Sequence, residues 1–206
     1  MKKHIVLAAC LAAGTVTGAM AQTVVEGPWL VRARVLNLDM ANRDSTGLGL
    51  SANNKTIGEL DATYFFTPNI ATELMLTVPQ KQTVHSAVQE ADLGTFKHQP
   101  TTLMLQYHFT GLPGYKPYVG AGYTYTHIKA ANLSSVDTEL NPLTLDTHDS
   151  GGALQLGVDI PLDKNWSLNF DIKKLYIQSR VYSDGTNVGT LKLNPLVAGV
   201  GVGYRF

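Results

Sequence analysis

The 206-residue chain holds a single cysteine, Cys10, and no apolar run after its N-terminal segment reaches the roughly 18 residues that a membrane helix needs. Helical periodicity is also scarce. Acidic and basic residues number 16 each, and removal of Lys2 and Lys3 with an N-terminal segment would leave 14 basic against 16 acidic residues, a net charge near −2. This balance gives no electrostatic reason to expect a nucleic-acid partner. Without linkers or low-complexity tracts, the chain is expected to form one domain.

The N-terminus has the pattern of a secretory signal peptide. A positive start, Met1–Lys3, precedes a short apolar stretch, Ile5–Val16, and an A-x-A site, Ala19–Ala21. We therefore expect a signal peptide over residues 1–21 and a mature chain over 22–206, which needs no disulfide in an oxidising periplasm. Leu7–Cys10 resembles a lipoprotein box, but too little apolar sequence precedes it.

The remainder alternates with period two, the pattern of β-strands. Eight strands are expected, over residues 29–38, 56–66, 70–78, 101–109, 118–128, 152–160, 166–182 and 191–206. One face of these strands is apolar, with aromatic residues near the strand ends. The other face is polar and carries Arg32, Arg34, Glu59, Asp61, Glu73, His108, Asp159, Asp171, Lys173 and Arg205.

Two features favour an arrangement with the apolar face outward. The polar face holds many glycines, which suit a crowded lumen, and Tyr and Trp flank the apolar face as in the girdles of membrane barrels. The expected fold is an all-β, eight-stranded antiparallel transmembrane barrel of the bacterial outer membrane. A soluble, lipocalin-like barrel is the alternative.

The connections alternate in length, which fits this fold. Short ones rich in Pro, Gly and Asn follow the second, fourth and sixth strands. Longer ones cover about 39–55, 79–100, 129–151 and 183–190. Outer-membrane barrels have short periplasmic turns and long extracellular loops. An even strand count places both termini in the periplasm.

The ordered motifs resemble the outer membrane protein W (OmpW) family over essentially the whole mature chain. The matching segments are Leu60–Leu74, Pro100–Phe109, Lys116–Tyr125, Gly157–Asp159, Asn165–Trp166, Leu193–Pro195 and Gly203–Phe206. The resemblance implies an eight-stranded barrel that helps small apolar compounds to cross the outer membrane, as members similar to the alkane-uptake protein AlkL do. It also implies links to stress responses and, for some members, a role as bacteriocin receptor. Val202, Tyr204 and Phe206 then have the spacing of the C-terminal signal that the barrel assembly machinery reads.

The charged face limits the mechanism. An eight-stranded barrel is barely wider inside than its own side chains, so opposite charges should pair and close the lumen. The expected plug comprises Arg32, Arg34, Glu59, Asp61, Asp171 and Arg205. An apolar solute would then enter between the long loops and leave sideways into lipid. Pro100 and Pro195, which lack an N–H, are candidates for the lateral opening; the alternative is that they merely end strands.

The sequence offers few candidates for a metal site or a catalytic site. His85, His98, His108, His127 and His148 show no i, i+2 or i, i+4 ligand spacing and three fall in expected loops, so no metal site is predicted. No G-x-S-x-G surrounds a serine, so the pairing of Ser167 with His108 does not predict an enzyme. No cofactor is expected.

Two other residue pairs have ordinary structural alternatives. Met75 and Met104 more often fill a lumen than line a substrate track. Lys173–Lys174 could contact lipopolysaccharide, although such a pair is usually just solvated.

The leading function is passive uptake of small apolar molecules. The expected partners are outer-membrane lipid with lipopolysaccharide, the barrel assembly machinery and the apolar solutes themselves. A structural or receptor barrel whose loops bind partners without transport is the alternative, and a lipid-modifying enzyme is a third, weaker one.

Overall fold

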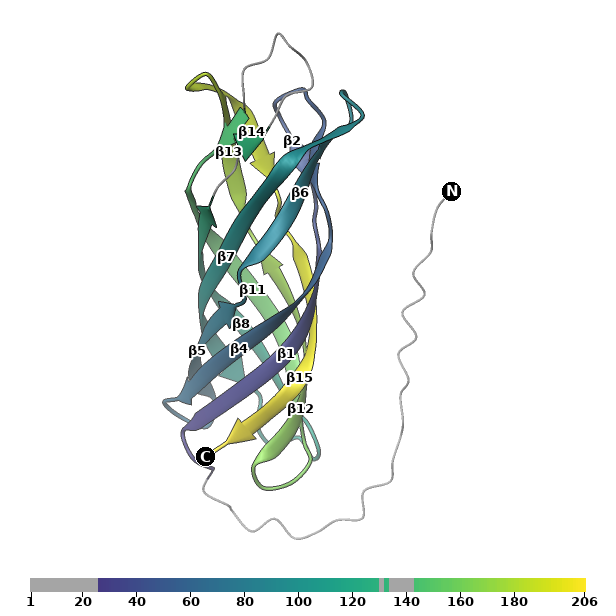
Figure 1. Cartoon of the computed structure of the whole chain (residues 1–206). Coiled ribbons are helices and arrows are strands. Elements are labelled where there is room, and N and C mark those ends of the chain that lie inside the picture. Colours follow the sequence, from purple (N-terminus) through teal and green to yellow (C-terminus); the bar gives the residue numbers. More distant parts are fainter. Residues whose placement is uncertain (1–25, 130–131, 134–142) are drawn as a thin grey trace.

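The structure is a computed structural model that describes residues 26–129, 132–133 and 143–206. The expected signal peptide and Cys10 lie outside these residues. Eight long strands form the body in Figure 1. They are β1 (Trp29–Asp39), β4 (Lys55–Phe65), β5 (Ile70–Thr77), β7 (Ala91–His108), β8 (Lys116–Lys129), β11 (His148–Pro161), β12 (Trp166–Leu175) and β15 (Leu196–Arg205). Within the described ranges, no helix is both long and apolar enough to cross a membrane.

The eight strands close on themselves. Each pairs antiparallel with the next in the order β1-β4-β5-β7-β8-β11-β12-β15, and β15 pairs with β1. At this seam the Phe206 N–H donates to the Trp29 carbonyl at 2.9 Å, and the Trp29 N–H donates back at 3.3 Å. The expected eight-stranded antiparallel barrel is therefore confirmed. Closure leaves no free edge between the first and the last strand.

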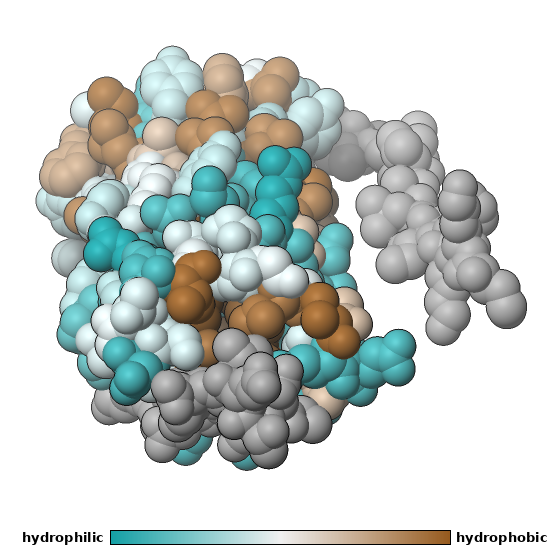
Figure 2. Space-filling model, turned by 90° about the horizontal axis from the view of Figure 1, so that it is seen from above, coloured by the Kyte–Doolittle hydropathy of each residue, from teal (hydrophilic) through white to brown (hydrophobic). Residues whose placement is uncertain are grey.

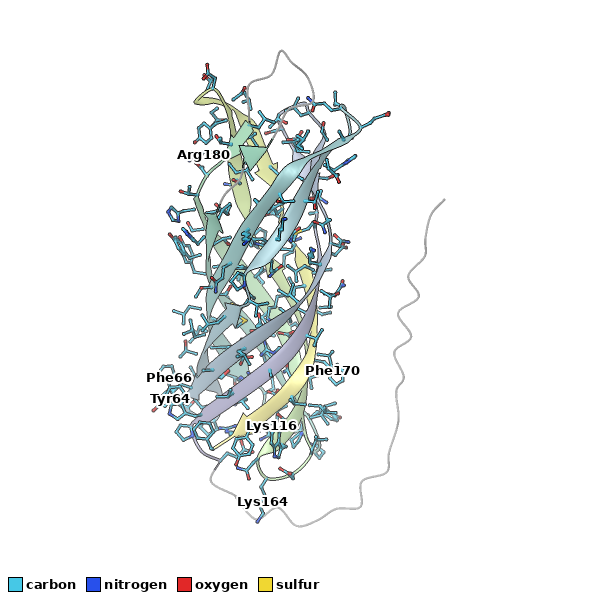
Figure 3. The ribbon with its side chains drawn as sticks, viewed as in Figure 1. Tyr64, Phe66, Lys116, Lys164, Phe170 and Arg180 are labelled. Atoms are coloured by element: carbon cyan, nitrogen blue, oxygen red, sulfur yellow. The ribbon has the colours of Figure 1, made fainter. Side chains whose placement is uncertain are left out.

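The apolar face of the strands points outward, as expected. Along β1, residues alternate between exposed and buried at every position, with Arg32 and Arg34 inside and Val31 and Val35 outside. Aromatic side chains gather on the outside at the short-turn end, where Tyr64 lies between Trp29 and Phe66 in edge-to-face contacts. Figure 3 shows Tyr64 and Phe66 at the foot of the barrel, pointing away from it. This surface suits lipid with an aromatic girdle.

Parts of the expected long loops are strands in the described residues. The seven shorter elements are β2 (Arg43–Asp44), β3 (Leu50–Ala52), β6 (Gln80–Ser86), β9 (Asn132–Leu133), β10 (Leu143–Leu145), β13 (Gln178–Ser183) and β14 (Thr186–Lys192). They extend the wall beyond the apolar belt, at the top of Figure 1. The expectation that residues 79–100 form a loop is wrong, because β6 and β7 form a hairpin there with Leu93 and Phe96 buried inside it.

Two expected strands are interrupted. The strand expected over 166–182 breaks between β12 and β13, and the strand expected over 191–206 breaks between β14 and β15, where Asn194 has a positive φ of 35° and Pro195 follows. Three short connections, over residues 66–69, 109–115 and 162–165, join the strands at the opposite end. The barrel therefore has one short-turn end and one long-hairpin end.

The lumen is crowded enough to require glycine at particular positions. A Cβ on Gly157 would lie 2.4 Å from the Tyr118 ring, and a Cβ on Gly199 would lie 2.2 Å from Asp171 Oδ1. The glycines of the polar face thus make room for larger polar side chains on the opposing strands.

Candidate functional site: a plugged lumen and a break in the wall

The interior of the barrel is divided into layers along its axis. A charged layer fills the lower part, and a large apolar cluster fills the part that the hairpins extend. At the short-turn end lies an open cavity of about 1130 Å³, lined by residues that include Phe65, His108 and Arg205.

Arg32 is the hub of the charged layer. Its side chain has no exposed surface, and it meets Asp159 with two donors, at 2.6 Å from Nη2 and 3.1 Å from Nε. Its Nη1 also lies 3.1 Å from Glu73 and 3.4 Å from Asp61. A guanidinium suits this role because its fixed fork can serve several carboxylates at once.

Arg34 and Lys173 complete the layer. Arg34 contacts Glu59 at 3.0 Å, Glu73 at 2.5 Å, Asp61 at 3.1 Å and Asp171 at 3.2 Å. Lys173 Nζ lies 2.6 Å from Glu59 and 3.0 Å from Asp171. Three bases thus hold five buried acids, a set we call the charged plug: Arg32, Arg34, Glu59, Asp61, Glu73, Asp159, Asp171 and Lys173.

Neutral side chains tie the plug to the wall. Gln106 Nε2 donates to Glu73 at 2.7 Å, and Gln155 Nε2 donates to Asp171 at 3.0 Å. Asn169 Nδ2 donates to Asp159 at 2.8 Å. Gln106 bonds the Glu73 oxygen that the bases leave free, whereas Gln155 and Asn169 share carboxylate oxygens with the bases, so the plug is a connected network and not a set of isolated ion pairs.

Sequence reasoning placed most of the plug but not all of it. Glu73, Asp159 and Lys173 were assigned to the polar face without a role in the plug. Arg205 lies apart from it, nearer the short-turn end, where it pairs with Glu26 at 2.5 Å and covers the Phe65 ring at 3.9 Å.

Lys173 is buried in the plug, so it is neither a lipopolysaccharide contact nor a solvated lysine, the two alternatives that the sequence offered. Lys173 and Lys174 are neighbouring residues of the same type, so residue type does not tell which one faces the lumen. Only the alternation of side chains along the strand assigns Lys173 to the lumen.

Ser167 and His108, which both face the lumen, form no hydrogen bond with each other in the described structure. His108 Nε2 lies 3.0 Å from Gln106 Oε1, and its ring stacks on Tyr118 with centroids 4.8 Å apart. His108 is therefore a hydrogen-bonded filler of the lumen.

The layer above the plug is apolar. Met75 and Met104 lie at its lower boundary, and aliphatic and aromatic side chains from every part of the wall continue upward. Members of this upper apolar cluster include Leu36, Leu38, Ile57, Val84, Leu93, Phe96, Ile128, Leu143, Ile177, Val181, Leu191, Leu193 and Val197. Figure 2, seen from the long-hairpin end, shows hydrophobic side chains in the middle of that end with polar ones around them.

A few polar groups interrupt the apolar cluster on one side. Gln80, Gln82, His98 and Thr126 face inward from β6, β7 and β8, and each has a buried polar atom without a hydrogen-bond partner. Only the contact of 3.2 Å between Gln82 Nε2 and His98 Nε2 links two of them. Such groups destabilise the closed barrel.

The wall has a break next to these residues. The ladder between β4 and β5 stops at the pair Glu59 and Thr77, and the ladder between β3 and β6 resumes only at the pair Ala52 and Val84. Between these points, residues 53–58 and 78–83 form no ladder pair with each other: residues 55–58 pair with β1 and residues 80–83 pair with β7, but β4 does not pair with β6. Two backbone N–H groups bond across the break: Val78 N–H donates to the Gly58 carbonyl at 3.3 Å, and Thr83 N–H donates to Asn53 Oδ1 at 2.9 Å.

Prolines lie on the β6 side of this break. Val78 and Pro79 are both exposed, so the alternation slips by one residue, and Pro79 supplies no N–H. Pro100, on the adjacent β7, is buried and takes a side-chain bond from Thr77 Oγ1 at 2.9 Å. Pro100 thus borders the same weak part of the wall.

The wall around Pro195 is bonded more completely. The Leu175 N–H donates to the Pro195 carbonyl at 3.2 Å, and the Leu193 N–H donates to the Ile177 carbonyl at 2.9 Å. On the other flank, the Ala41 N–H donates to the Leu193 carbonyl at 2.8 Å. The interruption before β15 is thus bridged by hydrogen bonds on both sides.

The histidines are placed in strands and not in loops, which corrects the expectation for three of them. His85 lies in β6, His98 in β7 and His148 in β11. Within the described part of the chain, no three His, Cys, Asp or Glu side chains gather as a metal site would require.

The profile of the OmpW family matches residues 26–206. The chain belongs to the OmpW family. The family resemblance of the sequence motifs is thereby confirmed, and with it the location in the bacterial outer membrane.

Individual relatives agree with this membership. The chain is 37% identical over 187 residues to the outer-membrane protein y4mB of Sinorhizobium fredii, covering 87% of this chain and 80% of that protein. It is 32% identical over 120 residues to the dibenzothiophene metabolism operon protein DoxH of a Pseudomonas strain, covering 55% of this chain and 53% of that protein. The crystal structure of OprG from Pseudomonas aeruginosa superposes with a TM-score of 0.76 at 24% identity, covering 88% of this chain and 96% of OprG.

Proposed function

We propose that this OmpW-family barrel mediates passive uptake of small apolar molecules across the outer membrane. The solute enters between the long hairpins, reaches the upper apolar cluster, and leaves sideways into the lipid. The observation that carries this proposal is the upper apolar cluster itself, which stands above a closed charged plug and beside a break in the wall.

The plug supports a sideways route. Passage down the axis would have to displace Arg32 and Arg34 from their carboxylates, and breaking one buried ion pair costs about 3–5 kcal/mol. Several pairs would have to open at once, so an apolar solute, which offers the charges nothing in return, has no favourable axial path.

The break between β4 and β6 supports an exit at that place. Opening it disrupts few backbone hydrogen bonds, and Ile57 and Val84, on the strands that border it, belong to the upper apolar cluster. Outside, exposed side chains such as Leu60 and Leu76 form the lipid-facing surface. A solute would therefore pass from one apolar environment to another.

The relatives support the class of solute. DoxH is named for an operon of dibenzothiophene metabolism, and dibenzothiophene is a small, apolar aromatic compound. We infer that the solutes of this chain are of similar size and polarity.

The remaining assignments belong to the same proposal. The signal peptide over residues 1–21 directs export, and both termini lie in the periplasm. Val202, Tyr204 and Phe206 are exposed on the outer face, where the barrel assembly machinery would read them. Lipopolysaccharide contacts the outer ends of the strands.

A receptor barrel without transport is the second candidate. The continuous plug favours it, because a sealed lumen is equally suited to a scaffold whose hairpins bind partners. A lipid-modifying enzyme is disfavoured, since Ser167 and His108 both face the lumen and not the lipid.

Uptake in intact cells separates these candidates. Cells that lack OmpW-type proteins are given this protein or an empty vector, and the initial rate of entry of a radiolabelled aromatic hydrocarbon is measured. Transport predicts a faster rate with the protein, with no change for a hydrophilic sugar of similar mass. Equal hydrocarbon rates with correctly inserted protein would refute transport and favour the receptor.

The exit is tested by replacing the proline beside the break with a residue that has a backbone N–H. Pro79→Val allows ladder pairing across the break and should lower uptake, while Pro195→Val makes the same change at the bridged interruption and should leave uptake unchanged. If Pro195→Val alone lowers uptake, the exit lies before β15 instead. If both folded variants take up hydrocarbon normally, lateral exit at either proline is refuted.

A further inference from the structure

Two histidines that are distant in sequence face each other on the outer surface. His127 on β8 and His148 on β11 are direct partners in the ladder between these strands. Their Nδ1 atoms lie 3.1 Å apart, and the ring centroids are 4.8 Å apart. The hydroxyl of Tyr125 lies 2.8 Å from His148 Nδ1, so His148 Nδ1 has two polar neighbours.

The level of this cluster places it outside the apolar belt. His127 is also the ladder partner of Gln99 on β7. Two residues further toward the long-hairpin end of the same strands, Lys97 pairs with Lys129. The exposed side chains below, on the other hand, are apolar, such as Leu103 and Leu105. The cluster therefore lies in the aqueous or headgroup layer, where ions have access.

The separation of the two nitrogens fits a single metal ion. With metal–nitrogen bonds of about 2.0–2.1 Å, two imidazole ligands of one ion lie about 2.9 Å apart in a square-planar arrangement and about 3.3 Å apart in a tetrahedral one. The observed 3.1 Å lies between these values. Directly opposed positions on paired strands hold side chains at a fixed spacing, so little ordering is needed to bind the ion.

The other described histidines do not share this arrangement. His85 lies 3.0 Å from Asp92, His98 contacts Gln82, and His108 contacts Gln106. The polar partner of each of these is a carboxylate or an amide, whereas His127 and His148 place two imidazole nitrogens 3.1 Å apart. Neutral imidazole is a preferred ligand of divalent zinc, copper and nickel.

We propose that His127 and His148 form a surface site for a divalent transition-metal ion, with water in the remaining positions and the Tyr125 hydroxyl beside it. The bound ion joins β8 to β11 at the base of the long hairpin that connects them. This site is independent of the lumen and of solute uptake.

The test uses the purified barrel in detergent micelles, carrying no histidine tag. Titration with Cu²⁺, followed by electron paramagnetic resonance, should show one saturable ion per chain with nitrogen hyperfine coupling from imidazole. Titration with Zn²⁺, followed by calorimetry, should give the same stoichiometry, and Mg²⁺ should not bind. Either His127→Asn or His148→Asn should weaken binding at least about tenfold, as removal of even an outer-shell partner does.

His85→Asn is the matched control, because it removes an exposed histidine of the same hairpin layer that has no imidazole neighbour. It should leave Cu²⁺ affinity unchanged. Unaltered heat-modifiable migration on gels checks that each variant is folded. The proposal is overturned if Cu²⁺ binds without nitrogen coupling, if His127→Asn retains full affinity, or if His85→Asn weakens binding as much.

Discussion

Replacing Arg32 by methionine should lower the free energy of unfolding of the barrel strongly. Methionine keeps much of the apolar stem but removes the charge. The side chain is fully buried against Asp159, Glu73 and Asp61 at 2.6–3.4 Å. At an effective dielectric constant of about 20, one pair of unit charges at about 4 Å is worth roughly 4 kcal/mol. Allowing for relaxation, we expect Arg32→Met to lower the free energy of unfolding by about 3–5 kcal/mol.

Urea unfolding of the refolded barrel in micelles measures this loss. Trp29 and Trp166 both lie in the exposed aromatic girdle, so their fluorescence changes when the unfolding chain leaves the micelle. Arg180→Met is the control, since Arg180 is exposed at the hairpin end, as Figure 3 shows, and lies 3.9 Å from Asp146. It should change stability by at most about 0.5 kcal/mol.

A double variant tests the cause. If the cost of Arg32→Met comes from an uncompensated carboxylate, adding Asp159→Asn should recover a substantial part of it, because the amide keeps the shape and removes the charge. A loss below about 1 kcal/mol for Arg32→Met, or a double variant as unstable as the two changes summed, would refute the account of the plug as a coupled network.

Three further changes probe other layers. Gly157→Ala should destabilise the barrel by about 1–3 kcal/mol in urea unfolding, because the added methyl group collides with Tyr118. Gly58→Ala is the control: a Cβ there meets nothing within 4 Å, so this change should be neutral or slightly stabilising. Gln80→Leu should raise the unfolding free energy by about 1 kcal/mol, since both amide atoms of the buried glutamine lack partners. Two backbone N–H groups, of Trp166 and Asn165, hold the pKa of Asp163 below its usual 3.8. The stabilisation that its carboxylate gives the folded state should therefore be complete above that value and be lost as pH falls through the lower folded pKa. NMR titration of the Asp163 carboxyl measures that folded pKa.

The fold could be predicted from the sequence because the barrel repeats one rule. Inside the apolar belt, side chains alternate between lipid and lumen, so a single parity assigns every residue, and charged positions such as Arg32 and Asp171 identify the lumen directly. The same parity assigns Lys173 to the lumen, where the structure places it. The pairing partners in the plug could not be derived, because they depend on the shear of the closed barrel.

The hairpin end was less predictable for a physical reason. Above the membrane the outer face meets water, so the strong contrast between the two faces is lost, and polar strands such as β6 resemble loops. The ladder that brings His127 opposite His148 depends on register across a long connection. Spacing along the chain carries no information about such a pair.

The layering of the lumen bears directly on what drives the proposed transport. Burying apolar surface from water is worth about 25 cal/mol per Å², so a hydrocarbon gains free energy on entering the upper apolar cluster. Moving from that cluster through the wall into lipid exchanges one apolar environment for another, which changes little further. The closed plug prevents water from following the solute along the axis, since Arg32 and Arg34 remain bound to their carboxylates. The direction of net flow would then be set by concentration alone, and saturating the lipid with hydrocarbon should abolish uptake without any change in the barrel.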